Sequence, residues 1–482
     1  MHLFVLIHGL WGSATHMAAV KEVLDTTYGV KAGGDMVAYA TQSNHGTLTY
    51  DGVKVCARRC YLEIKEVIRR YSEDEGVTFD RISILGYSLG GLIARYLSGI
   101  LLDEGFFDKV KPVVFSTIAT PHLGSKFHRT DKRWFAWMNS LGGTYLGSTG
   151  RDLFLKDPTI AEMSDPSSSA YKALELFESR VLLANCRNDR TVHFPTAFIT
   201  AANPFANLRW LDLKFHEVKL SEPVVDKYGW SHSPRIIDFK QTTKRSIPLP
   251  VYHEHIRQKL VFWTFAATVG PLAITAVLIA SMFFTNNSNN RVSKFLREGD
   301  KVLMDEILES IKMETFDEEW MNEGEEKDEK SVGKTDEKDE NAKKQPSPVS
   351  ETDTSKAEED ADVMAAGITE ATVEGVILGD DLNSNDEPAS TETKVVGLEE
   401  AMEAARHTGD RGLIPSWTRN APFSEEVLTM IENMDKLGWE KYAVYITVIH
   451  SHAAIVARRG LTQQGQGAAT LRLFSEIIRS KI

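Results

Sequence analysis

The chain has 482 residues and a formal net charge of -13 at pH 7, which is long enough for one large core or two smaller ones. Residues 301–400 alone carry a net charge of -21, so the remainder is mildly basic at +8, with dispersed cations that give no support to nucleic-acid binding. The three cysteines, Cys56, Cys60 and Cys186, are too few for a disulfide framework and lie in no zinc-binding spacing, which favours a reducing compartment.

The first 250 residues have the pattern of a parallel sheet covered by helices on both faces. The apolar start lacks a basic region and runs directly into a glycine turn, so it predicts a strand and not a signal peptide. From residue 3 to about 240, short β-branched runs alternate with amphipathic stretches. The predicted strands are 3–7, 81–85, 112–118 and 181–186, and the predicted helices are 55–70 and 90–102. We assign 1–250 to this α/β core.

Residues 260–284 form an apolar run of 25 positions without a charge, which is long enough to span a membrane. Cations flank both ends of the run, and Gly270 and Pro271 fall near its middle. Positive charge on both sides favours neither orientation, so a hairpin or in-plane anchor is preferred over a single transmembrane span or a buried soluble segment.

Two further segments follow the apolar run. Residues 314–397 combine acidic residues, Lys, Ser and Thr with almost no aromatic residues, so we expect a disordered acidic insertion. Order is predicted to return in 422–482, with a helix at 424–436, a strand at 442–449, a histidine pair and further helix. We expect this C-terminal strand, histidine and helix to complete the core.

The strongest chemical signal is Gly86-Tyr87-Ser88-Leu89-Gly90, which follows a predicted strand and opens an apolar helix. This strand, turn and helix context makes G-x-S-x-G a nucleophile elbow. The two glycines allow the sharp turn that exposes the seryl oxygen at its tip. We therefore predict Ser88 as a nucleophile, against the alternative of a structural serine in a glycine turn.

A glycine-rich loop, His8-Gly9-Leu10-Trp11-Gly12, closes the first strand. Its position matches the loop that donates one oxyanion NH in α/β-hydrolases, the other NH coming from the residue after the nucleophile. Leu10 and Leu89 are thus the predicted backbone donors of the oxyanion hole. We expect His8 to hydrogen-bond locally, because it precedes the serine and the base usually follows it.

Asp189 is the predicted acid, because it stands just past the carboxyl end of the buried strand VLLANC. Its carboxylate would fix the tautomer of the catalytic imidazole and stabilise the imidazolium. The alternative is an Asn-Asp turn in which Asp189 caps a helix.

The base is His452 in this interpretation, because it ends a predicted strand and precedes a helix. His450 is its neighbour and an alternative, and His232, His253 and His255 remain alternatives before the second half of the chain. If Asp189 lies before the apolar run and His452 after it, a single crossing would separate them. Either the run returns to the same face, or the base is His232, His253 or His255.

The chain resembles the fungal "putative serine esterase" family of the α/β-hydrolase superfamily, which contains lipid-droplet phospholipases and monoacylglycerol lipases. The matching segments are LIHGLWG at 6–12, LGYSLGGLIARY at 85–96, TPHLG at 120–124, NDRTV at 188–192, WEKYAVYI at 439–446 and HSHAAIVAR at 450–458. The resemblance implies a Ser88, Asp189 and His452 triad and an ester-linked lipid substrate.

We therefore expect an α/β-hydrolase that cleaves phospholipid or monoacylglycerol esters by acyl transfer, with no metal or organic cofactor. We expect it on the cytosolic face of the endoplasmic reticulum or on lipid droplets, while the oligomeric state, headgroup and chain length stay open. The alternatives are an acyltransferase or thioesterase with the same triad, and a non-catalytic membrane tether. Trp134 to Met138, after the TPHLG segment, could contribute to a lid or to the core.

Overall fold

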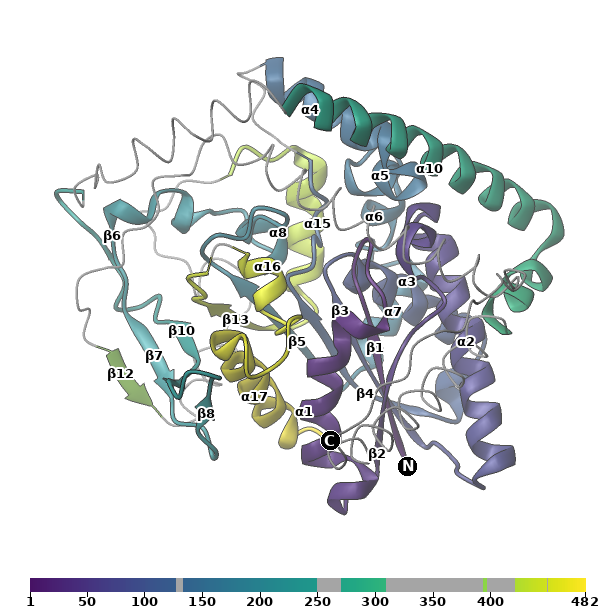
Figure 1. The fold of residues 1–482 in the computed structure, drawn as a ribbon, viewed down its shortest axis with the longest axis horizontal. Coiled ribbons are helices and arrows are strands. Elements are labelled where there is room, and N and C mark those ends of the chain that lie inside the picture. Colours follow the sequence, from purple (N-terminus) through teal and green to yellow (C-terminus); the bar gives the residue numbers. More distant parts are fainter. Residues whose placement is uncertain (127–132, 249–269, 309–392, 397–420, 449) are drawn as a thin grey trace, which may run out of the picture.

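The computed structural model describes residues 1–126, 133–248, 270–308, 393–396, 421–448 and 450–482 (Figure 1). These residues build one nine-stranded sheet in the order β12-β7-β10-β13-β5-β4-β3-β1-β2. The strands are β1 (His2–Ile7), β2 (Met36–Ala40), β3 (Arg81–Tyr87), β4 (Lys111–Ile118), β5 (Ser179–Asn185), β7 (Phe215–Val218), β10 (Arg235–Ile237), β12 (Thr393–Val396) and β13 (Glu440–Val444). All pairings are parallel except those of β10 with β7 and β13.

The first strand shows why the sheet is buried on both faces. Successive side chains of a strand point to opposite faces. Leu3, Val5 and Ile7 belong to one hydrophobic cluster, and Phe4 and Leu6 belong to the other. A strand whose side chains are buried at every position and nearly all apolar is expected in a parallel sheet with helices on both sides.

Helices cover the two faces unequally, as the arrangement in Figure 1 shows. The cluster of Phe4 is covered by α1 (Ala18–Tyr28) and α17 (Gly465–Arg479), and that of Leu3 by α2 (Val53–Asp74), α3 (Leu89–Asp103), α7 (Ser169–Leu176) and α15 (Glu425–Asp435). The other named helices are α4 (Arg133–Tyr145), α5 (Gly147–Leu153), α6 (Thr159–Glu162), α8 (Phe194–Phe198), α10 (Gly270–Glu298) and α16 (Ser451–Ala454). Short 3-10 helices are η1 (Ala14–Met17), η2 (Val30–Ala32), η3 (Gly46–Asp51), η4 (Phe106–Asp108) and η5 (Pro204–Trp210).

The layered architecture and mostly parallel sheet agree with the predicted α/β-hydrolase fold. Two smaller two-stranded sheets pair β6 (Leu211–Asp212) with β11 (Thr243–Lys244) and β8 (Val224–Val225) with β9 (Ser231–His232). The strand predicted at 442–449 instead runs from Glu440 to Val444, and β2 was not predicted. Only the last part of the predicted acidic insertion is described, and there Thr393–Val396 form β12 rather than disordered chain.

The prediction that residues 260–284 form a membrane anchor needs a correction. Residues 260–269 lie outside the described part, while α10 begins at Gly270 with Pro271 at its first turn, where proline fits a helix. The helix continues to Glu298 through a polar stretch of asparagines and runs along α4 and α5 (Figure 1). None of the described helices is long and apolar enough to cross a bilayer, so the transmembrane prediction is not supported.

A buried ion-pair network fastens α10 to the rest of the fold. Asp51, at the end of η3, has a fully buried side chain. Its carboxylate forms ion pairs with the guanidinium groups of Arg59 at 2.7 Å and of Arg291, in α10, at 2.8 Å. Arg291 also donates to the carbonyl oxygen of Thr47 at 3.1 Å. One carboxylate therefore satisfies two guanidinium groups, and that of Arg291 lies 240 residues away from Asp51 in sequence.

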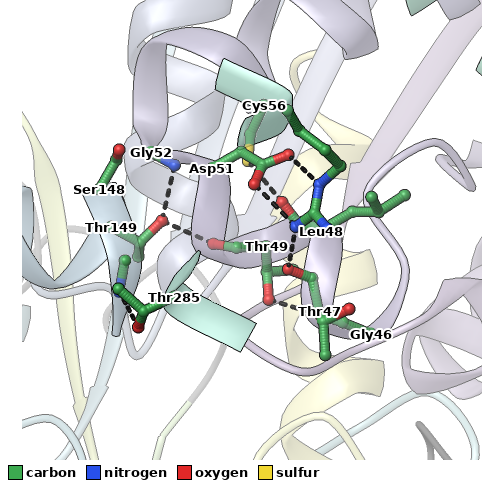
Figure 2. A network of polar contacts seen from close by, with 12 residues as sticks. Gly46, Thr47, Leu48, Thr49, Asp51, Gly52, Cys56, Ser148, Thr149 and Thr285 are labelled. Carbon is green, nitrogen blue, oxygen red and sulfur yellow. Dashed lines mark hydrogen bonds and ion pairs between the residues drawn. The ribbon is translucent and has the colours of Figure 1, made fainter. Parts of the chain in front are cut away.

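Hydroxyl groups extend this network toward α5, as Figure 2 shows. Thr149 accepts from the Gly52 amide at 3.0 Å and donates to the Thr49 carbonyl at 2.6 Å. Thr285 of α10 accepts from the Gly147 amide at 3.2 Å. The Phe284 ring packs on the Tyr50 ring at 6.3 Å between centroids. Helix α10, η3 and α5 thus form one packed unit.

We predict that Asp51→Asn lowers the free energy of unfolding by about 3 kcal/mol, because it leaves two guanidinium groups without their common carboxylate. The midpoint of urea unfolding measures this loss. Asp305→Asn, which changes an exposed carboxylate close to α10, is the matched control and should shift the midpoint little. Equal midpoints for the two variants would contradict the structural role of Asp51.

Candidate active site

Ser88 occupies the sharp turn between β3 and α3. Its backbone has φ 55° and ψ -127°, a conformation that L-residues rarely adopt and that costs roughly 1–3 kcal/mol. The neighbouring glycines make the turn possible. A Cβ on Gly90 would lie 2.1 Å from the Ile7 carbonyl oxygen, and one on Gly86 would lie 2.3 Å from the Gly91 Cα. The serine hydroxyl is thereby held at the carboxyl edge of the sheet, where parallel α/β folds bind ligands.

His452 connects Ser88 to Asp189 through two hydrogen bonds. The imidazole Nε2 is 3.0 Å from Ser88 Oγ, and Nδ1 is 2.8 Å from Asp189 Oδ2. Because a carboxylate only accepts, Nδ1 carries the proton and Nε2 accepts from the hydroxyl. All three side chains are less than 10% exposed, so water does not compete for these bonds.

Asp189 has a structural contact as well as the one to His452. Its Oδ1 accepts from the amides of Thr191 at 3.2 Å and Val192 at 2.8 Å, which leaves Oδ2 for the imidazole. The sequence offered two roles for Asp189, as the cap of a turn and as the acid. In the structure Oδ1 caps the turn and Oδ2 contacts His452, so one carboxylate has both contacts. Fixing one oxygen on backbone amides orients the other.

The loops that carry Asp189 and His452 are bonded to each other. Asn185, the last residue of β5, accepts from the Ile446 amide at 2.9 Å, and Asn188 donates to the Thr447 carbonyl at 2.9 Å. The sequence did not single out Asn185, and Asn188 was considered only as part of an Asn-Asp turn. Their position at the end of an apolar strand was the available signal, but their partners lie about 260 residues further along the chain.

The structure separates His452 from the other candidate bases that it describes. His232 pairs with Asp226 at 2.8 Å. His450 directly precedes α16, and the two distances to the nucleophile and acid belong to His452. His253 and His255 lie outside the described residues.

The loop that follows β1 packs directly against Ser88. A Cβ on Gly9 would lie 2.7 Å from Ser88 Cβ, so only glycine allows this approach. Leu10 comes next in this loop, and Leu89 opens α3, where an amide has no acceptor within the helix. The backbone amides of Leu10 and Leu89, the predicted oxyanion donors, thus belong to the two segments that flank the serine.

Trp11 continues this loop with a positive φ of 54°, which is unusual for a bulky residue. Its amide donates to Thr49 Oγ1 at 3.1 Å, and its ring lies 6.4 Å from the Tyr50 ring. Both partners belong to η3, which Asp51 ties to α10. The sequence carries no local signal for this support, because it depends on contacts between distant segments.

His8 makes the local hydrogen bond expected from the sequence, since its Nδ1 donates to the Gly9 carbonyl at 3.0 Å. Burial lowers the pKa of His8 from 6.5 to about 4, and that of His16 from 6.5 to about 3. The Arg458 guanidinium lowers both values further. Both rings are neutral at pH 7 and add no cation to the loop.

No group of side chains within the described residues has the composition of a metal site. Cys56, Cys60 and Cys186 are free and buried, and burial raises the pKa of the Cys56 thiol to about 12. The thiols therefore offer no nucleophile that would compete with Ser88.

Residues 1–203 match the family model "Putative serine esterase (DUF676)", in agreement with the resemblance drawn from the motifs. The chain is 30% identical over 209 residues to "Putative lipase C4A8.10" of Schizosaccharomyces pombe, covering 41% of this chain and 26% of that protein. "Putative lipase ROG1" of Saccharomyces cerevisiae is 29% identical over 206 residues, with 41% and 28% covered.

The chain thus spans little more than a quarter of the length of these two relatives. The family match includes Ser88 and Asp189 and ends before His452. Among solved structures, "Phospholipase PlaB from Legionella pneumophila in complex with thio-NAD" has a TM-score of 0.28 and 13% identity, covering 62% of this chain and 63% of that chain. An extracellular alpha/beta-hydrolase from a Paenibacillus species has a TM-score of 0.24 and 16% identity, covering 41% and 83%.

The buried histidines predict an acid-sensitive fold. A histidine whose pKa is lowered on folding stabilises the protein above pH 6.5, and this stability is lost as the pH falls from 6.5 toward the folded pKa near 4. We expect a loss of about 2–3 kcal/mol from His8 over this window. His8→Asn, which keeps a donor for Gly9, should flatten the decline of melting temperature below pH 6.5. A decline as steep as in the wild type would contradict this assignment.

Proposed function

We propose that this chain is a serine hydrolase that cleaves the carboxylic ester bond of a phospholipid or monoacylglycerol. The observation that carries the proposal is the continuous hydrogen-bonded series from Asp189 through His452 to Ser88. Nucleophile, base and acid in this order perform acyl transfer in unrelated folds, so the arrangement supports the chemistry independently of ancestry. The match of residues 1–203 to a serine esterase family model supports the same reaction class.

In the proposed mechanism His452 Nε2 takes the proton from Ser88 Oγ as the oxygen attacks the ester carbonyl. The negative charge on the carbonyl oxygen is received by the amides of Leu10 and Leu89. The imidazolium then gives its proton to the departing alcohol, which leaves an acyl group on Ser88. Water, deprotonated by His452, releases the fatty acid and restores the serine. Asp189 holds the imidazole in the required tautomer throughout.

A lipid substrate is supported by the outer face of α10. Ile279, Met282 and Phe283 follow one another at helical spacing and are 63%, 58% and 61% exposed. Single exposed apolar residues are ordinary, whereas a row on one helix indicates an interaction surface. The same helix carries the exposed cations Lys294 and Arg297, which suit anionic headgroups. We propose that this helix rests on a lipid surface, in place of a membrane span.

We further propose that the enzyme works at the cytosolic surface of the endoplasmic reticulum or of lipid droplets. The three free cysteines support a compartment in which thiols stay reduced. No cofactor takes part in the proposed reaction.

We predict that Ser88→Ala, His452→Ala and Asp189→Asn each lower kcat/KM for ester hydrolysis by about 10⁴-fold or more, because the three groups act as one unit. Release of fatty acid from monoacylglycerol and phospholipid, with a short soluble ester beside them, measures the loss. Hydrolysis by the Ser88→Ala protein at the wild-type rate would refute the proposal. Acyl transfer to added alcohol or thiol in preference to water would redirect it to an acyltransferase or thioesterase.

We predict that replacing Ile279, Met282 and Phe283 together by serine weakens binding to vesicles of mixed anionic phospholipid at least about tenfold, because each buried apolar side chain contributes about 1.5–3 kcal/mol. Vesicle flotation measures the binding, and turnover of a short soluble ester should change little. Leu176→Ser alters an exposed leucine on α7 and is the control. Undiminished flotation of the triple variant would exclude this face as the lipid contact.

A further inference from the structure

Tyr87, the residue before the nucleophile, is fully buried and touches His452 in two ways. The two ring centroids are 5.1 Å apart with the planes tilted by 34°. The Tyr87 hydroxyl donates to the main-chain carbonyl oxygen of His452 at 2.9 Å. A single side chain therefore contacts both the imidazole and the backbone that carries it.

Arg458 completes this contact from the segment after α16. Its Nη2 donates to the Tyr87 hydroxyl at 3.0 Å, and its guanidinium carbon lies 5.7 Å from the centroid of the Tyr87 ring. The hydroxyl thus donates to the carbonyl of His452 and accepts from Arg458. Both bonds hold the phenol in one orientation against the imidazole.

The element that carries His452 has little rigidity of its own. Helix α16 is four residues long, and His452 is 364 residues away from Ser88 in sequence. Tyr87 is bonded covalently to Ser88, so its contact with His452 fixes the distance between nucleophile and imidazole. A misplacement of about 1 Å at such a site can cost a hundredfold in rate.

We infer that Tyr87 is a positioning residue that aligns His452 with Ser88 and whose ring stabilises the imidazolium formed during proton transfer. This inference rests on the proposed hydrolase function. The imidazolium would meet the π face of Tyr87, which attracts cations. The other groups that face the imidazole are Ser88, at the end of β3, and Asp189, after β5. Arg458 donates to the phenol hydroxyl.

The test is the second-order rate of Ser88 labelling by a fluorophosphonate, measured per labelled site at saturation. Tyr87→Phe keeps the ring and loses the hydrogen bond to the His452 carbonyl, so we expect labelling about tenfold slower. Tyr87→Leu loses both contacts, and we expect labelling about a hundredfold slower. With a short soluble ester, kcat should fall in the same order while KM stays within twofold.

Tyr171→Phe is the matched control, because this buried tyrosine of α7 also donates its hydroxyl to a main-chain carbonyl, that of Asn433 at 3.0 Å. It should lose stability but label at the wild-type rate. The graded loss, in which phenylalanine rescues part of the rate that leucine loses, would not follow from a purely structural role.

Three outcomes are decisive. Labelling of Tyr87→Leu within twofold of the wild type per site overturns the inference. If the leucine variant does not fold, Tyr87→Phe decides alone, and a rate equal to that of the wild type overturns it. Failure of the wild type itself to label refutes the proposed function instead, so the two failures are distinguishable.

Discussion

The parallel pairing of β13 with β5 is the constraint on which the candidate site depends. Glu440 is in register with Val181, and Val444 with Asn185, so the two strands end side by side. The loops that follow them carry Asp189 and His452, and hydrogen bonds from Asn185 and Asn188 join those loops. A slip of one residue would move the C-terminal loop by about 3.3 Å, which is longer than either hydrogen bond of His452.

Strained backbone conformations occur at Ser88 and in the loop that packs against it. Ser88 and Trp11 both have positive φ although neither is glycine, and each conformation costs about 1–3 kcal/mol. Their amides are held from outside the turn, that of Ser88 by the Ile118 carbonyl at 3.0 Å and that of Trp11 by Thr49 at 3.1 Å. The surrounding fold thus keeps both segments in conformations that they would not adopt alone.

Helix α10 shows why an apolar run does not by itself define a membrane span. Phe284 packs inward on Tyr50, while Ile279 and Phe283 face outward from the same turns. Further along the helix, Arg291 forms an ion pair with the buried carboxylate of Asp51. Hydropathy counts apolar residues without regard to what they contact, so a helix that is packed on one face and exposed on the other resembles a spanning segment.

The turn that carries Ser88 and the sheet could be predicted from local patterns. The elbow around Ser88 requires glycines within two residues, and the predicted strands and helices of the first half needed only the alternation of apolar positions. The end of β13 could not be predicted from the sequence as well, since the predicted strand extended five residues beyond Val444. The apolar run continues past the strand as Tyr445 and Ile446, which are buried without belonging to it.

The sequence by itself determined the α/β architecture, the elbow and the choice of Ser88, because each depends on residues that are close together along the chain. The tertiary structure decided which histidine is hydrogen-bonded to Ser88 and placed Tyr87 and Arg458 beside that histidine. It also decided that α10 is connected through η3 to the loop of Trp11. These contacts join segments up to several hundred residues apart, and their geometry is set by the order of strands in the sheet, which no local pattern encodes.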